Sequence, residues 1–366
     1  MNQNEVSLFI KQQCDKLYKP DSPGIAVAVV SNGELLCSHA AGSANIEHGI
    51  LITPHTIFDI GSAAKQFTAF AIAILVHEDK ISLEDDIREH LSFVPDFGEP
   101  IRIRHLIYHT SGLHNHFPLF RFAQHCYTIK DVHRLVQNQT KLEFSPGERF
   151  AYNNTGYSLL TSIIEQVTGQ SFPHWMKSRI FDQLDMKNTL VNDNYMQIIR
   201  DCAQAYSPDH AYGYIKDMQA YPIGSGAVFS NILDLAKWIG NLGTGKVGGT
   251  DVIESIQEQG KLNDGDTIPY AFGLFKGDIY GAPLIEHGGE ARGFGSAISF
   301  LPIQKTGIVV LANSSEFDVW GMVRSFYNNI IFQQYHTDSK LQKKKVTIQA
   351  ICAKKSVKNL IKFQNA

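Results

Sequence analysis

Ser62 and Lys65 are the two residues of this sequence best placed to do chemistry together. They stand three residues apart, directly before an apolar run at residues 66–77, and side chains three apart share one face of a helix. The first turn of a helix has N–H groups without intrahelical partners and favours developing negative charge. Apolar surroundings favour a neutral lysine, which can accept a hydroxyl proton. The spacing predicts a serine nucleophile activated by a lysine. The alternative is a helix-capping serine followed by a solvated lysine.

Tyr152 and Asn154 lie in a second segment with reactive side chains, residues 144–157, which is bounded by proline and glycine and leads into a predicted helix. A nearby ammonium stabilises the ionised form of a phenol, so Tyr152 could take and return the nucleophile's proton. The amide of Asn154 can orient both Lys65 and a substrate carbonyl. A capping asparagine and a packing tyrosine are the alternative reading of this loop.

A glycine-rich segment at residues 284–295 contains His287, followed by Gly288, Gly289 and Glu290. Glycines in a strand let another backbone lie close, and an unpaired N–H group there could complement that of Ser62 as an oxyanion hole. His287 is expected to supply a hydrogen-bond donor at neutral pH. A histidine at a strand end with a purely structural role is the alternative.

The elements that must position these residues are strands at both ends of the chain and helices between them. A strand, turn and strand at residues 24–40 precede helical patterns that dominate residues 59–240. We predict an α/β fold in which residues 1–58 plus 266–336 form one discontinuous domain and residues 59–265 an inserted, mainly helical domain. Further predicted helices are 5–18, 62–80, 83–91, 103–108, 129–137, 155–168, 172–180, 233–242 and 318–333; further predicted strands are 270–276, 283–287, 295–301 and 307–312.

The charge is unevenly distributed along the 366 residues. There are 33 Lys and Arg against 36 Asp and Glu, but eight of the lysines lie in residues 340–366, which contain no acid. The rest of the chain therefore carries a formal charge of about −11, which argues against nucleic acid as the main partner. We interpret residues 337–366 as a basic extension, with weak association with anionic membranes as the alternative to a solvated tail.

The five cysteines, Cys14, Cys37, Cys126, Cys202 and Cys352, are dispersed without metal-type or disulfide-framework spacing. Histidine pairs at 105/109 and 114/116 lack an HExxH or comparable ligand set, so no metal site is predicted. The first residues show neither a basic segment nor a sustained apolar run. We therefore expect a cytoplasmic protein; a leader outside the given sequence would make it periplasmic or secreted.

Taken in order, Ser-x-x-Lys, Tyr-x-Asn and His-Gly-Gly resemble the motifs of the serine β-lactamase and penicillin-binding-protein superfamily. The resemblance is to the class C-like branch of esterases, DD-peptidases and D-aminopeptidases, and it covers about residues 20–335. Residues 105–113 resemble the family's LLxHTSGL segment, and residues 223–238 its glycine-rich loop and following helix. The resemblance implies an antiparallel sheet flanked by terminal helices, with an inserted all-helical domain.

The resemblance also implies a mechanism. Ser62 would attack a carbonyl, Lys65 and Tyr152 would manage its proton, and the N–H groups of Ser62 and Glu290 would hold the oxyanion. Asn154, His287 and the two glycines would bind substrate, and no metal or organic cofactor is implied. A Lys-Thr-Gly triplet at residues 305–307, the third motif of many β-lactamases, follows Pro302 and precedes an apolar run. We assign it to a turn between strands and not to the site.

The expected function is that of a serine hydrolase that forms an acyl-enzyme on Ser62 and acts on a small-molecule or peptide ester or amide. An esterase or D-amino-acid peptidase is favoured over a β-lactamase, because a mostly neutral His287 replaces an always-charged lysine and weakens binding of a substrate carboxylate. β-Lactam hydrolysis is one alternative. A catalytically idle member of the fold, used for binding or scaffolding, is the other.

Overall fold

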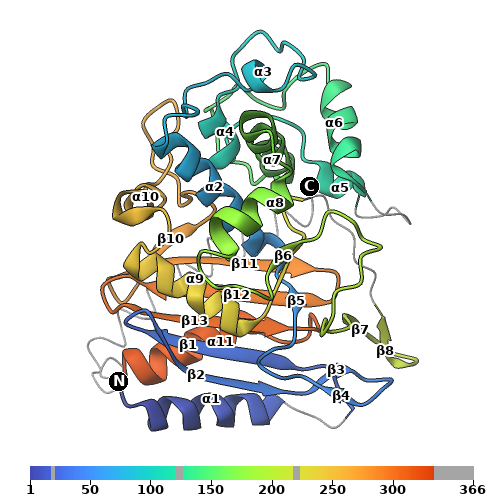
Figure 1. The fold of residues 1–366 in the computed structure, drawn as a ribbon, viewed down its shortest axis with the longest axis vertical. Coiled ribbons are helices and arrows are strands. Elements are labelled where there is room, and N and C mark those ends of the chain that lie inside the picture. Colours follow the sequence, from blue (N-terminus) through green and yellow to red (C-terminus); the bar gives the residue numbers. More distant parts are fainter. Residues whose placement is uncertain (18–20, 121–126, 217–222, 334–366) are drawn as a thin grey trace.

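The computed structural model describes residues 1–17, 21–120, 127–216 and 223–333, and its centre is a six-stranded antiparallel sheet (Figure 1). The strand order is β10-β11-β12-β13-β1-β2, so strands from the two ends of the chain meet in one sheet. The strands are β1 (Ile25–Ser31), β2 (Glu34–Ala41), β10 (Phe275–Ile279), β11 (Ala282–Ala291), β12 (Phe294–Leu301) and β13 (Thr306–Ala312). This arrangement confirms the predicted antiparallel sheet.

The hairpin of β1 and β2 follows from local sequence. β1 is rich in valine and is buried along nearly its whole length, as expected of a central strand with both faces covered. Asn32 and Gly33 connect the two strands with φ angles of 52° and 85°, which asparagine and glycine tolerate best. On its other side β1 pairs with β13 without a break, from Ile25 opposite Ala312 to Ser31 opposite Thr306.

Terminal helices cover one face of the sheet, as the resemblance implies. α1 (Gln3–Leu17) packs on β1 and β2, and α11 (Val319–Phe326) packs on β12 and β13. Apolar side chains of both helices, including Val6, Ile10 and Phe326, share one core cluster with this face. A π-helical turn (Tyr327–Ile331) extends α11.

The opposite face of the sheet is covered by α9 (Ile232–Thr244), which contacts β1, β2 and β13. The predicted helical domain, residues 59–265, includes this helix, whereas the structure packs it on the sheet. An amphipathic pattern marks a helix with one apolar face but does not say which layer that face covers, so the sequence left this packing undecided.

The remaining helices form the layer above the sheet in Figure 1. α2 is buried from Lys65 to Leu75, as its apolar composition predicts, and it packs against α7. The helices of this part are α2 (Lys65–His77), α3 (Ile87–His90), α4 (Ile103–Ile107), α5 (His116–Phe120), α6 (Ile129–Gln137), α7 (Asn154–Thr168), α8 (Phe172–Met176), with a π-helical turn (Lys177–Phe181), and α10 (Gly249–Ser255).

Short strands join the two layers. β5 and β6 flank β9 in a three-stranded sheet, while β3 pairs with β4 and β7 with β8. They are β3 (Ser43–Asn45), β4 (Ile50–Leu51), β5 (Phe58–Asp59), β6 (Leu190–Val191), β7 (Tyr206–Asp209), β8 (Gly213–Lys216) and β9 (Val228–Ser230). Strands of two to four residues carry too little periodicity to be predicted.

Several predicted boundaries differ from the structure. The helix predicted at 83–91 is limited to Ile87–His90, where Asp86 forms a capping box with Glu89. The strand predicted at 270–276 begins only at Phe275, because Tyr270 makes an isolated bridge to Phe275 and does not extend the sheet. The basic extension at 337–366 lies outside the described residues. Among the described helices, none combines the length and apolar character needed to cross a membrane.

Candidate active site

Ser62 lies in a short 3₁₀ turn, Gly61–Ala64, that leads from β5 into α2. The turn is tied down on two sides: the hydroxyl of Ser296 donates to the carbonyl of Ile60 at 2.7 Å, and the N–H of Gly61 donates to Asp59 at 2.8 Å. Gly61 has a φ of 53°, a left-handed conformation that favours glycine. Ser62 is partly exposed in an otherwise buried turn, so its hydroxyl is within reach of a substrate.

Lys65, the first residue of α2, points its amine at Ser62. Lys65 Nζ lies 3.1 Å from Ser62 Oγ and donates to the carbonyl of Ser225 at 2.7 Å. The side chain has no exposed surface, and burial lowers its pKa well below the usual 10.5. Within the described residues, no carboxylate forms an ion pair with Lys65. A neutral amine beside the hydroxyl is the form that can accept a proton.

Tyr152 lies beside this pair, with its ring centroid 4.9 Å from Lys65 Nζ. Its hydroxyl is shielded from solvent and completes no hydrogen bond among the described residues. Burial raises the pKa of Tyr152, while the nearby Ser62 hydroxyl lowers it to a smaller extent. The sequence predicts that an ammonium stabilises the phenolate, but burial favours the neutral forms of both Lys65 and Tyr152. The incomplete contact with Ser62 is typical of catalytic groups before substrate binds.

Asn154 begins α7, but the helix cap is its neighbour. The side chain of Asn153 accepts from the N–H of Gly156 at 3.0 Å and donates to the carbonyl of Leu113 at 2.5 Å. The side chain of Asn154 makes no hydrogen bond to any described residue, Lys65 included. The capping asparagine is therefore Asn153, and the side-chain amide of Asn154 has its donors and its acceptor available for a substrate.

His287 faces the helical layer from β11 and is 3% exposed. Its Nδ1 lies 2.6 Å from the carbonyl oxygen of Gly288, and its Nε2 lies 3.0 Å from the hydroxyl of Tyr270. Burial lowers the pKa of His287 to about 3, so the ring is neutral. We expected this histidine to offer substrate a donor, but both ring nitrogens already have protein partners. Donation from His287 to substrate therefore stays a prediction, and it would require one of these two contacts to open.

Gly289 and Gly61 allow β11 to lie directly against the turn that holds Ser62. A Cβ on Gly289 would stand 2.0 Å from the carbonyl oxygen of Ile60 and 2.6 Å from the amide nitrogen of Ser62. A Cβ on Gly61 would stand 2.9 Å from the amide nitrogen of Glu290. The backbones that carry the N–H groups of Ser62 and Glu290 are therefore neighbours, as an oxyanion hole requires.

The side chain of Glu290 belongs to the other face of β11. Successive strand residues alternate between faces, and the even positions before it contact α11: Glu286 pairs with Arg324 at 2.7 Å, and a Cβ on Gly288 would meet Trp320. Glu290 is exposed. Its backbone N–H, and not its carboxylate, is the part that can serve the site.

Sequence reasoning assigned no role to Tyr270 or Ser225, or to the individual residues His109 and Tyr157. His109 packs its ring 4.3 Å from that of Tyr152 and accepts from the N–H of Asn153 at 3.0 Å. The hydroxyl of Tyr157 donates to the carbonyl of Ile107 at 3.0 Å. The signal for His109 was present in the family-like segment 105–113, whereas nothing in the local sequence of Tyr270 indicates a partner.

Two other sequence features lie away from this cluster. Lys305, with a φ of 46°, lies in the turn between β12 and β13, as predicted, whereas Thr306 and Gly307 are already the first residues of β13. The histidines considered as metal ligands have protein partners: His105 accepts from the N–H of Arg102, His114 pairs with Glu143, and His116 bonds Thr155. Over the described ranges, no three His, Cys, Asp or Glu side chains gather as metal ligands would.

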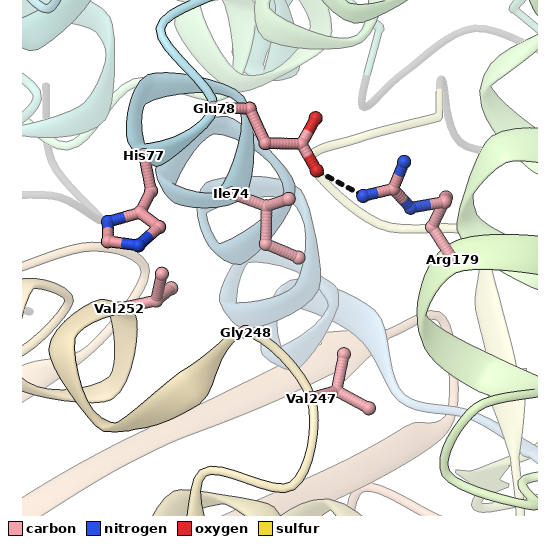
Figure 2. Close-up of a pocket in the computed structure, with 7 residues that line it drawn as sticks. All are labelled: Ile74, His77, Glu78, Arg179, Val247, Gly248 and Val252. Atoms are coloured by element: carbon pink, nitrogen blue, oxygen red, sulfur yellow. Dashed lines mark hydrogen bonds and ion pairs between the residues drawn. The ribbon is translucent and has the colours of Figure 1, made fainter.

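A hollow of about 290 Å³ lies at the far end of α2 (Figure 2). Figure 2 shows His77 and Ile74 of α2 on its wall, with Glu78 paired to Arg179 at its rim. Thirteen residues of helix separate Glu78 from Lys65, a distance of about 20 Å. This hollow is therefore separate from the Ser62 cluster and holds none of its groups.

The fold and the cluster of Ser62, Lys65 and Tyr152 define a protein of the serine β-lactamase and penicillin-binding-protein superfamily, whose members share an acyl-enzyme serine mechanism. The Beta-lactamase family model matches residues 11–321. The chain therefore belongs to the Beta-lactamase family, a family of serine hydrolases.

Individual relatives agree with this assignment. A D-aminopeptidase of Gluconobacter oxydans (strain 621H) is 25% identical over 305 residues, which cover 80% of this chain and 56% of that protein. Protein flp of Staphylococcus aureus (strain MW2) is 28% identical over 337 residues, covering 86% and 64%. The chain thus spans less than two thirds of the length of these curated relatives. The structure of the octameric penicillin-binding protein homologue from Pyrococcus abyssi is similar with a TM-score of 0.78 and 26% identity, covering 91% of this chain and 78% of that one.

Proposed function

We propose that this protein hydrolyses an ester or amide through an acyl-enzyme on Ser62. The observation that carries the proposal is the placement of Lys65: its amine has no exposed surface, lies 3.1 Å from Ser62 Oγ and lacks a carboxylate partner in the described structure. Each of these conditions favours a neutral amine that can act as a base. A structural lysine would instead be expected to reach solvent or an acid.

The proposed reaction has two halves. Lys65 Nζ takes the proton of Ser62 Oγ as the oxygen attacks the substrate carbonyl, and the N–H groups of Ser62 and Glu290 hold the resulting oxyanion. The protonated phenol of Tyr152 donates to the leaving alcohol or amine and recovers its proton from Lys65. Water then attacks the acyl-enzyme by the reverse route, which releases the acid and restores Ser62.

An ester or a D-amino-acid amide or peptide is the favoured substrate class. Lys65 and His287 are both buried and shifted towards their neutral forms, so neither offers the positive charge that a β-lactam carboxylate would require. The similarity to proteins named D-aminopeptidase supports the same choice.

The test compares the protein with Ser62→Ala on p-nitrophenyl esters, D-amino-acid p-nitroanilides, D-Ala-D-Ala peptides and nitrocefin. We expect turnover of esters or D-amino-acid substrates to exceed that of nitrocefin, and Ser62→Ala to lower it by about 10⁴-fold or more. Ser178→Ala, which removes a hydroxyl from a π-helical turn outside the site, is the matched control. Intact-mass spectrometry should detect an acyl adduct that maps to Ser62. Equal turnover by the protein and Ser62→Ala, or no adduct with any acylating substrate, would overturn the proposal.

A further inference from the structure

Tyr270 and His287 form a buried pair behind the glycine segment of β11. The Tyr270 hydroxyl lies 3.0 Å from His287 Nε2, and the two side chains are 0% and 3% exposed. Tyr157 also interacts with the Tyr270 hydroxyl, but its own proton goes to Ile107, so it can only accept from Tyr270. His287 Nε2 is the acceptor at 3.0 Å.

The partners of His287 fix where its single proton lies. A carbonyl oxygen only accepts, so the 2.6 Å contact with Gly288 requires a proton on Nδ1. Nε2 then carries a lone pair and accepts from Tyr270. Without that hydroxyl, Nε2 would be a buried acceptor with no partner. Moving the proton to Nε2 would leave the Nδ1 lone pair facing the Gly288 oxygen. The Gly288 carbonyl therefore fixes the tautomer of His287, and the Tyr270 hydroxyl supplies a donor to the Nε2 lone pair that this tautomer leaves.

The part of β11 that begins at His287 is not paired with a strand on both edges. Pairing of β10 with β11 ends at Phe275 opposite Glu286, so residues 287–290 have neighbouring strand β12 on one edge only. On the face of β11 that carries His287, Gly289 packs against Ile60 and Ser62. Because β10 does not reach this segment, the contact with His287 adds a restraint on the peptide between Gly288 and Gly289 to those that β12 and the Ser62 turn supply.

The geometry points to Tyr270 as a positioning residue for the hydrolysis. Through His287 and the carbonyl of Gly288, it holds β11 so that the N–H of Glu290 stands beside that of Ser62 at the oxyanion. This role rests on the proposed function. It assigns His287 to the support of the oxyanion hole and not to direct donation to substrate.

The variant Tyr270→Phe removes the hydroxyl and keeps the ring, which packs 4.6 Å from that of His109. We expect kcat for ester hydrolysis to fall by about tenfold to a hundredfold with little change in KM, because a misplaced oxyanion donor is felt mainly in the transition state. Tyr327→Phe is the matched control, since Tyr327 is equally buried and donates to Ser299 at 3.0 Å beneath α11. That variant should keep the wild-type kcat.

The ¹⁵N chemical shifts of His287 supply a readout that loss of packing alone would not produce. In the wild type they should report a proton on Nδ1 and no titration above about pH 5. In Tyr270→Phe the Nδ1 proton should remain, because the Gly288 carbonyl still requires it, and the Nε2 shift should move because its lone pair loses its donor. Unchanged shifts together with an unchanged kcat would overturn the inference.

His287→Asn provides a second test that does not depend on the fold of Tyr270→Phe. An asparagine amide can occupy the place of Nδ1 and donate to Gly288, but it presents nothing at Nε2 for Tyr270 to hold. We expect it to retain more activity than His287→Gln, and Tyr270→Phe to add no further loss in the Asn background. If His287→Asn and Tyr270→Phe reduced activity independently, so that their fold-losses multiplied in the double variant, the inference would be contradicted. Continued labelling of Ser62 in these variants would leave the proposed hydrolase function standing, whereas no labelling even in the wild type would remove both.

Discussion

The charge state of Lys65 in the native protein can be tested by measuring how the unfolding free energy depends on pH. Its burial lowers its pKa well below 10.5, so between the native pKa and 10.5 the unfolded chain binds one proton more than the native protein. Stability therefore rises with pH across this window, and the gain is lost as the pH falls towards the native pKa. The slope for one proton is about 1.4 kcal/mol per pH unit.

The perturbation is Lys65→Met, which keeps an unbranched side chain of similar length but cannot titrate. Relative to this variant, the unfolding free energy of the wild type should rise with pH below about 10.5, by up to about 1.4 kcal/mol per pH unit, over the range in which the native amine is already neutral. Urea denaturation at half-unit intervals measures this difference, provided that unfolding is reversible. Lys261→Met, at an exposed position, controls for the loss of a lysine as such.

Parallel stability curves for the wild type and Lys65→Met over this window would refute the reasoning. They would mean that Lys65 is charged in the native protein despite its burial, held by its contacts with Ser62 and Ser225. A protonated Lys65 could not accept the Ser62 proton, and the mechanism would need another base.

Two further substitutions test the surroundings of Ser62. Gly289→Ala would place a Cβ 2.0 Å from the Ile60 oxygen, so we expect about a hundredfold loss of kcat and a loss of about 1–3 kcal/mol of stability, measured by ester hydrolysis and urea denaturation. A Cβ on Gly277 would meet no atom within 4 Å, so Gly277→Ala should change neither kcat nor stability. Equal effects of the two substitutions would contradict the close approach of Gly289 to Ile60. Burial raises the pKa of Asp59 from 3.8 to about 7, so the wild type should lose about 4 kcal/mol relative to Asp59→Asn as the pH rises from about 4 to about 7. A pH-independent difference in unfolding free energy would show that Asp59 ionises normally.

The parts of the fold that could be predicted are those that local sequence decides. The hairpin of β1 and β2 depends on valine-rich strands and an Asn-Gly turn, and α2 depends on an apolar composition that only a buried helix tolerates. The layer that α9 covers could not be predicted in this way, because the same apolar stripe fits the sheet as well as a helical bundle. The start of β10 at Phe275 was missed for a related reason: a β-like composition does not show whether a pairing strand is present.

The residues of the site likewise fall into those that local spacing brings together and those that only the tertiary structure brings together. Ser62 and Lys65 are neighbours because they stand three positions apart along a helical turn, and that proximity requires no information from the rest of the chain. The approach of residues 287–290 to the Ser62 turn joins segments more than 220 residues apart, and it depends on where β11 lies in the sheet. No periodicity encodes that distance: the glycines of residues 284–295 indicated only that another backbone could lie close, and the resemblance to a known family supported the Ser62 turn as that backbone.

The sequence by itself determined the residue types that can react and the local spacing that joins Ser62 to Lys65. Tertiary structure decided their charge states and partners. Burial favours the neutral forms of Lys65, His287 and Tyr152, and both ring nitrogens of His287 have protein partners, the hydroxyl of Tyr270 and the carbonyl of Gly288. The physical reason is that pKa values and tautomers depend on solvent exclusion and on the atoms within hydrogen-bond distance, which are properties of the packed protein and not of its sequence pattern.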